Sequence, residues 1–146
     1  MRLEIVNPAS LAAPRGWSHG VLAPRDGRLL FVAGMAGFTE GQTGEPPAFV
    51  EQFARALDQL LAVVREAGGE ASDVARMTVY VTDLAEYRAA RAALGGVWRE
   101  RFGRHYPAMA LLEVKGLVDR GARARCSRRR ATSASPRTPR ASRSCS

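Results

Sequence analysis

The chain has 146 residues and a formal net charge of +8, a length that fits one domain with a single core. No apolar run approaches the roughly 18 residues of a membrane span, and residues 1–4 do not resemble a secretory signal, so we expect a cytoplasmic protein without a membrane partner. Residues 1–119 carry 13 Lys and Arg against 14 Asp and Glu, whereas residues 120–146 carry nine Arg and no acidic residue. The positive charge therefore belongs to the end of the chain, and its body is close to neutral.

The first third of the chain predicts short strands. Residues 3–6 predict a strand that ends at Asn7-Pro8, because proline removes a backbone donor and fixes φ. Two apolar runs, at 21–23 and 29–33, flank a segment that contains Asp26-Gly27, and Asp-Gly between apolar runs is typical of a hairpin. We therefore expect these two runs to pair with each other as antiparallel strands.

Helical periodicity begins after the glycine-rich segment that ends at Pro47. Apolar residues recur at spacings of three and four from 48 to 67, which predicts an amphipathic helix closed by Gly68-Gly69. The alternating, β-branched run 77–82 predicts a strand. Asp83, with Glu86 three residues later, predicts the start of a second helix.

A last strand is expected over 109–114, after Pro107. The resulting order predicts an α+β fold, a mixed β-sheet with two helices packed on one face. The other face of such a sheet needs a cover, which a partner subunit would supply.

The composition changes abruptly after Asp119. Residues 120–146 contain nine Arg, six Ser and five Ala, with no Leu, Ile, Val, Phe, Met, Trp or Tyr. We therefore expect a domain over 1–119 and a basic, low-complexity tail over 120–146 that adds nothing to the core. Both cysteines, Cys126 and Cys145, fall in this segment, which argues against cysteine chemistry in the core.

Three interpretations of residues 120–146 stay open. The first is a non-native, frame-shifted ending, which is favoured because the change falls where a final strand should begin and because the codons of these residues are rich in G and C. The second is a disordered tail. The third, and least favoured, is an arm that binds the phosphates of a nucleic acid.

Several segments, taken in order, suggest a known family. They are Gly16-Trp17-Ser18-His19-Gly20, Leu30-Phe31-Val32-Ala33-Gly34, Glu51-Gln52, Ala67-Gly68-Gly69, Thr78-Val79-Tyr80-Val81-Thr82-Asp83 and Tyr106-Pro107-Ala108-Met109. Over about residues 5–119 the chain resembles the Rid (YjgF-like) family. The resemblance implies a chorismate-mutase-like fold and homotrimers, with three small-molecule sites in clefts between subunits. Active members hydrolyse imines and enamines such as 2-iminopropanoate to keto acids and ammonia, with no metal or organic cofactor.

The resemblance also implies which residues form the site. The expected substrate-binding residues are Trp17, Ala33, Gly34, Arg91, Met109 and Leu111. In the family pattern the segment at 107–109 reads Pro-Ala-Arg, and the arginine forks onto the substrate carboxylate. Met109 stands there in this chain, and a thioether neither pairs with a carboxylate nor donates a hydrogen bond.

Other departures from the family pattern make the expected site less polar. Ala33 replaces a serine, Met35 a glutamine, and Leu111 a position often held by cysteine, while Arg91 replaces an asparagine. In the family pattern the last strand carries a Glu-x-Glu-like motif, and in this chain the segment 123–127, which has no glutamate, stands near that position. Each charged hydrogen bond contributes about 1.5 to 3 kcal/mol, so losing both arms of the arginine fork should slow catalysis by about two to four decades.

Two functions stay open on these residues. The protein is either an imine or enamine hydrolase with reduced or altered activity, or a non-deaminating trimer that binds a small ligand and has a regulatory role. In both, the expected ligand is a small carboxylate or imine. Glu113 is the weak catalytic candidate, although a structural glutamate at a strand edge is commoner. Arg104 is a candidate to replace the lost guanidinium.

Overall fold

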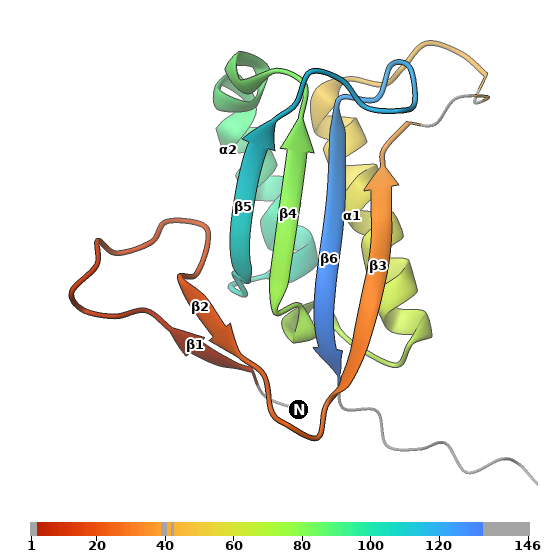
Figure 1. Cartoon of the computed structure of the whole chain (residues 1–146). Coiled ribbons are helices and arrows are strands. Elements are labelled where there is room, and N and C mark those ends of the chain that lie inside the picture. Colours follow the sequence, from red (N-terminus) through yellow and green to blue (C-terminus); the bar gives the residue numbers. More distant parts are fainter. Residues whose placement is uncertain (1–2, 39–40, 42, 133–146) are drawn as a thin grey trace, which may run out of the picture.

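The computed structural model describes residues 3–38, 41 and 43–132. A four-stranded sheet carries both helices on one face, and a small two-stranded sheet lies beside it (Figure 1). The main sheet consists of β3 (Arg28–Ala36), β4 (Arg76–Val81), β5 (Ala108–Glu113) and β6 (Ala124–Thr132), in the order β3-β6-β4-β5. Only the β4–β5 pair is parallel. The predicted α+β fold, with a mixed sheet and two helices on one face, is confirmed.

The two long helices begin and end at the expected signals. Helix α1 (Phe49–Glu66) is followed by Gly68, whose φ of +80° lets its N–H and that of Gly69 bond back to the last turn. Helix α2 (Leu84–Phe102) begins at Asp83, whose carboxylate accepts the N–H groups of Ala85 and Glu86. A short 3-10 turn, η1 (Ala71–Asp73), links α1 to β4.

The core lies between the helices and the sheet. Its largest fully buried apolar side chains are Leu57, Leu60, Leu61, Met77, Val64, Val74, Val79 and Val81. They come from one face of α1, from the helix-facing positions of β4 and, for Val74, from the segment between η1 and β4. Burying a side chain of this size contributes about 1.5 to 3 kcal/mol. On the other face of the sheet, Leu29, Phe31 and Leu112 are exposed.

The expected hairpin is not formed. The first run forms β2 (Gly20–Leu22), which pairs with β1 (Glu4–Val6), and the second forms β3, which pairs with β6. The chain does turn between them, where the N–H of Gly27 bonds to the carbonyl of Pro24. Pro24 has no N–H to give a ladder, and β6 offers β3 a longer antiparallel partner, so the local turn signal does not decide the pairing.

The expectation that residues 120–146 add nothing to the core is wrong for the start of this segment. Strand β6 lies between β3 and β4, and Ala122, Ala124 and Cys126 are buried. Its backbone pairs on both sides whatever its side chains are, and small side chains at alternate positions fit beneath the helices. The ordered domain thus runs beyond residue 119. Residues 133–146 lie outside the described residues, and the origin of the segment stays a prediction.

Cys126 therefore brings a thiol into the core, contrary to expectation. Burial raises the pKa of this thiol to about 12, because the apolar surroundings disfavour the thiolate. A thiol with so high a pKa is protonated at neutral pH and is a poor nucleophile. Cys126 consequently has a packing role.

Gln52 ties the start of α1 to the segment that precedes β6. Its side chain is fully buried, and its amide donates to the carbonyls of Pro47 (2.9 Å) and Gly121 (3.0 Å). Its amide oxygen accepts the N–H of Arg123 at 2.9 Å. One side chain thus satisfies three backbone groups from two segments that are far apart in the sequence.

Replacing Gln52 with leucine is expected to lower the free energy of unfolding by about 2 to 4 kcal/mol, because it leaves these backbone groups buried without partners. Urea denaturation followed by circular dichroism measures the change. Gln59→Leu, on the exposed side of the same helix, is the matched control and should change stability by less than about 0.5 kcal/mol. Equal losses in the two variants would contradict this role of Gln52.

Candidate functional site

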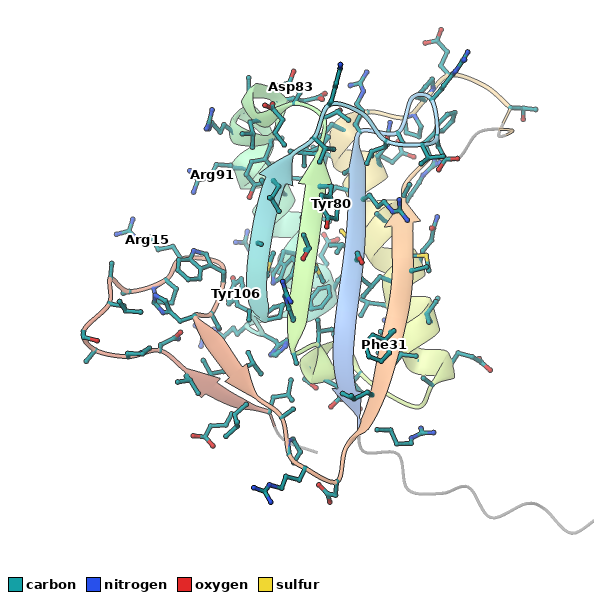
Figure 2. All side chains as sticks on the ribbon, in the orientation of Figure 1. Arg15, Phe31, Tyr80, Asp83, Arg91 and Tyr106 are labelled. Carbon is teal, nitrogen blue, oxygen red and sulfur yellow. The ribbon has the colours of Figure 1, made fainter. Side chains whose placement is uncertain are left out.

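A cavity with a mainly apolar lining lies between α2, β5 and the loop at 15–17. Its volume is about 440 Å³, within the range of small-molecule sites. The described residues that line it are Arg15, Gly16, Trp17, Phe53, Val79, Tyr87, Arg91, Leu94, Gly95, Trp98, Tyr106, Met109 and Leu111. Arg15, Arg91 and Tyr106 lie on the β5 side of the sheet, away from Phe31 on β3 (Figure 2).

Ser18 brings the loop at 15–17 to the start of β5. The buried Ser18 donates its N–H to the carbonyl of Pro107 at 3.0 Å and its hydroxyl to the carbonyl of Tyr106 at 2.6 Å. The loop enters this contact through Gly16, whose φ of +79° favours glycine. Trp17 is thereby held at the cavity, with its ring edge against His19 at a centroid distance of 4.7 Å.

Aromatic residues from α2 and the segment before β5 form a second wall. The ring of Trp98 stacks on those of Phe102 and Tyr106, at centroid distances of 4.3 and 5.9 Å. Its indole N–H donates to the carbonyl of His105 at 3.1 Å. Because Trp98 is both stacked and hydrogen-bonded, this wall is rigid.

Met109 and Leu111 close the cavity from β5. Both side chains are half-buried and pack against the core. Gly95 of α2 also lines the cavity, and the helix continues unbroken through Gly95-Gly96. The cavity wall at position 109 is therefore apolar, as the sequence predicts.

The charges at the cavity are all positive. Arg15 and Arg91 line it and are exposed, and within the described part of the chain neither forms an ion pair or a side-chain hydrogen bond. Among the described residues, the lining contains no carboxylate, imidazole or thiol. The cavity thus combines an apolar and aromatic interior with cationic groups, which suits an organic anion.

Four of the six predicted binding residues, Trp17, Arg91, Met109 and Leu111, line this one cavity. Ala33 and Gly34 do not, because they lie on β3 at the opposite edge of the sheet from β5. They form a bulge, where two residues of β3 stand opposite Ser127 alone. Within a single chain, the six predicted binding residues therefore fall into two groups, one at the cavity beside β5 and one on β3.

The side chain of Arg125 crosses Gly34 on the open face of the sheet. A Cβ at Gly34 would lie 1.5 Å from Nε of Arg125, so only glycine allows this crossing. With Tyr80 and Ser127, Arg125 also lines a smaller hollow of about 360 Å³. A guanidinium thus stands beside the two predicted binding residues of β3.

Neither of the other two candidates, Glu113 and Arg104, lines the cavity. The carboxylate of Glu113 accepts the N–H of Leu84 at 2.8 Å and so caps α2 rather than facing the cavity. Arg104 does not line the cavity, whereas Arg15, which the sequence did not single out, does. His19 contacts Asn7, and His105 bonds to the carbonyl of Val74 at 2.7 Å. Arg15 was signalled only by its position beside the Gly16-Trp17 motif.

The described residues offer neither a metal site nor a membrane-spanning helix. No group of three His, Cys, Asp or Glu side chains among them is placed to hold a metal ion. None of the helices they form is long and apolar enough to cross a bilayer.

The fold and the cavity define a class of small α+β proteins with a site beside the edge strand β5. The chain belongs to the Rid (YjgF-like) family, and residues 8–123 match the family described as "Endoribonuclease L-PSP". It is 34% identical over 95 residues to "Putative reactive intermediate deaminase TdcF" of Escherichia coli, covering 62% of this chain and 70% of that protein. A RutC family protein of Pyrococcus horikoshii is 31% identical over 117 residues, covering 78% and 86%.

The solved structures support the same fold. The Rid family protein YyfB of Yersinia pestis, of unknown function, superposes with a TM-score of 0.76 at 24% identity, covering 90% of this chain and 99% of that one. At this identity the likeness concerns the fold alone. It extends over most of the described chain, beyond residue 119.

Proposed function

We propose that the protein binds a small 2-imino acid, or the keto acid formed from it, in the cavity beside β5, and that it hydrolyses the C=N bond slowly. The observation that carries the proposal is that Trp17, Arg91, Met109 and Leu111, four positions of the family site, line one cavity. The likeness to a relative named as a reactive intermediate deaminase supports the same reaction class.

The proposed site needs more than one subunit. Ala33 and Gly34 lie at the β3 edge and Met109 at the β5 edge, so one chain cannot bring them together. We propose a homotrimer in which the β3 edge of one subunit completes the cavity of the next. The exposed Leu29 and Phe31 on β3 and the exposed Leu112 on β5 support association, because large apolar side chains at the two edges of a sheet favour burial against a partner.

The proposed reaction adds water to the imine carbon. The oxygen of water bonds to this carbon while the second electron pair of the C=N bond moves to nitrogen. Both protons of the added water then pass to nitrogen, the first giving a carbinolamine and the second as its C–N bond breaks, so that ammonia leaves and the oxygen becomes the carbonyl of the keto acid. Since the described lining has no carboxylate or imidazole to relay these protons, the main contribution of the chain is to bind and orient the substrate.

The test is an assay in which 2-iminopropanoate is generated from alanine in situ and its disappearance is followed. We expect a rate above the solvent background but about two to four decades below that of relatives with arginine at position 109. A rate equal to background, in a sample shown to be trimeric, would exclude hydrolysis of this substrate. That outcome would favour the second candidate, a non-deaminating ligand-binding trimer, which Met109 and the absence of an acid or base in the described lining also favour.

A further inference from the structure

We propose that Arg15 and Arg91 together provide the anion-binding charge that position 109 lacks, and that the cavity selects aromatic 2-oxo or 2-imino acids over three-carbon ones. This inference rests on the proposed function, since it assumes that the ligand binds in the cavity beside β5. It names the residues that would hold the carboxylate and the part of the ligand that the aromatic wall would contact.

The two arginines come from different elements and line one cavity. Arg15 comes from the loop that Ser18 anchors to β5, and Arg91 comes from the middle of α2, yet both line the same cavity. Both are exposed to solvent. Because the described lining has no acidic residue to neutralise them, their guanidinium groups are available to a ligand.

Other arginines on these elements have different surroundings. Arg101 on α2 forms a forked ion pair with Asp58 on α1, with distances of 2.7 and 2.9 Å. The carboxylate of Asp58 already pairs with this guanidinium, so it is not available to a ligand. The same contact lowers the pKa of Asp58. Arg15 and Arg91 differ in that they line a cavity and have no acidic partner in the described chain.

The interior of the cavity indicates the rest of the ligand. Trp17, Tyr87, Trp98 and Tyr106 contribute aromatic rings to its lining, and Met109 and Leu111 contribute aliphatic and thioether surface. A flat ring stacks favourably on such a wall, and a methyl group covers little of it. With about 440 Å³ available, the cavity accommodates a phenyl group behind the carboxylate. An arginine at 109 would put charge into this interior, whereas methionine keeps it apolar.

The experiment measures binding of phenylpyruvate and pyruvate to the full chain by calorimetry. Tryptophan fluorescence locates the ligand, because Trp17 and Trp98 are the two tryptophans of the chain and both line the cavity. We expect saturable quenching by phenylpyruvate and affinity for pyruvate lower by about tenfold or more. Phenylacetone, which lacks the carboxylate, should bind more weakly than phenylpyruvate and be insensitive to both arginines.

Arg15→Ala and Arg91→Ala should each weaken phenylpyruvate binding by about tenfold, and the double variant by about a hundredfold. Arg88→Ala is the matched control, because Arg88 is exposed on α2 outside the described lining. Thermal unfolding of each variant shows that it is folded. Unchanged affinity in the double variant, or an equal loss in Arg88→Ala, would overturn the inference.

The same measurements separate this inference from the proposed function. If pyruvate binds as tightly as phenylpyruvate and the arginine variants bind both normally, the inference fails while the cavity remains a keto-acid site. If a trimeric sample binds neither ligand, the proposed function fails with it.

Discussion

Replacing Met109 with arginine is expected to raise kcat/KM for 2-iminopropanoate hydrolysis by about two to four decades. The variant would place a guanidinium at the cavity wall, where it can fork onto the carboxylate and hold the imine carbon in position for water. Met109 is half-buried and borders open space, so a longer side chain has room. The rate is measured with imine generated in situ from alanine.

Met109→Gln is the control for this gain. Glutamine is polar and of similar length but has no charge, so it should leave the rate close to that of the unaltered chain. A folded, trimeric Met109→Arg variant that shows no gain would contradict the view that position 109 limits catalysis. The low rate would then have its cause elsewhere in the proposed site, and Ala33 and Arg125 would be the next residues to substitute.

A chain that ends at Asp119 is expected not to fold, whereas a chain that ends at Thr132 should keep the stability of the full chain. The shorter chain lacks β6, so β3 and β4 both lose their antiparallel partner and the core loses Ala124 and Cys126. Leaving two rows of backbone groups without partners costs more than the roughly 5 to 15 kcal/mol that stabilise a domain. Circular dichroism and urea denaturation measure both chains.

A folded chain ending at Asp119 would contradict the central position of β6. The longer truncation also separates folding from nucleic-acid binding, because it removes three of the nine arginines of residues 120–146 and leaves every strand pairing of β6. RNA binding that disappears in the chain ending at Thr132, with its stability unchanged, would support an arginine arm. We expect no such change.

Local sequence signals predicted the elements that local interactions determine. The apolar spacing of α1, the cap at Asp83 and the alternation of β4 all act within a few residues, and the structure has each of them. The partner of β3 was mispredicted because strand pairing depends on which edge is free in the folded sheet. Strand β6 could not be predicted from apolar alternation because its buried residues, Ala124 and Cys126, are small.

The candidate site was predictable only in part. The family pattern indicated Trp17, Arg91, Met109 and Leu111, which line one cavity. Arg15 and Trp98 belong to that cavity through the contact of Ser18 with Tyr106, which joins segments far apart in the sequence. A contact between residues 88 positions apart cannot be predicted from local periodicity or spacing. Glu113 was a chemically reasonable base, but its hydrogen bond to Leu84 depends on how β5 meets α2.

The mass of the purified full chain in solution tests the central claim most directly, because a site completed by the β3 edge of a neighbour does not exist in a monomer. Light scattering after size exclusion gives this mass without assumptions about shape. We predict about three times the chain mass of 15.8 kDa. A mass of 15.8 kDa at the concentrations used for the binding and imine assays would contradict a shared site.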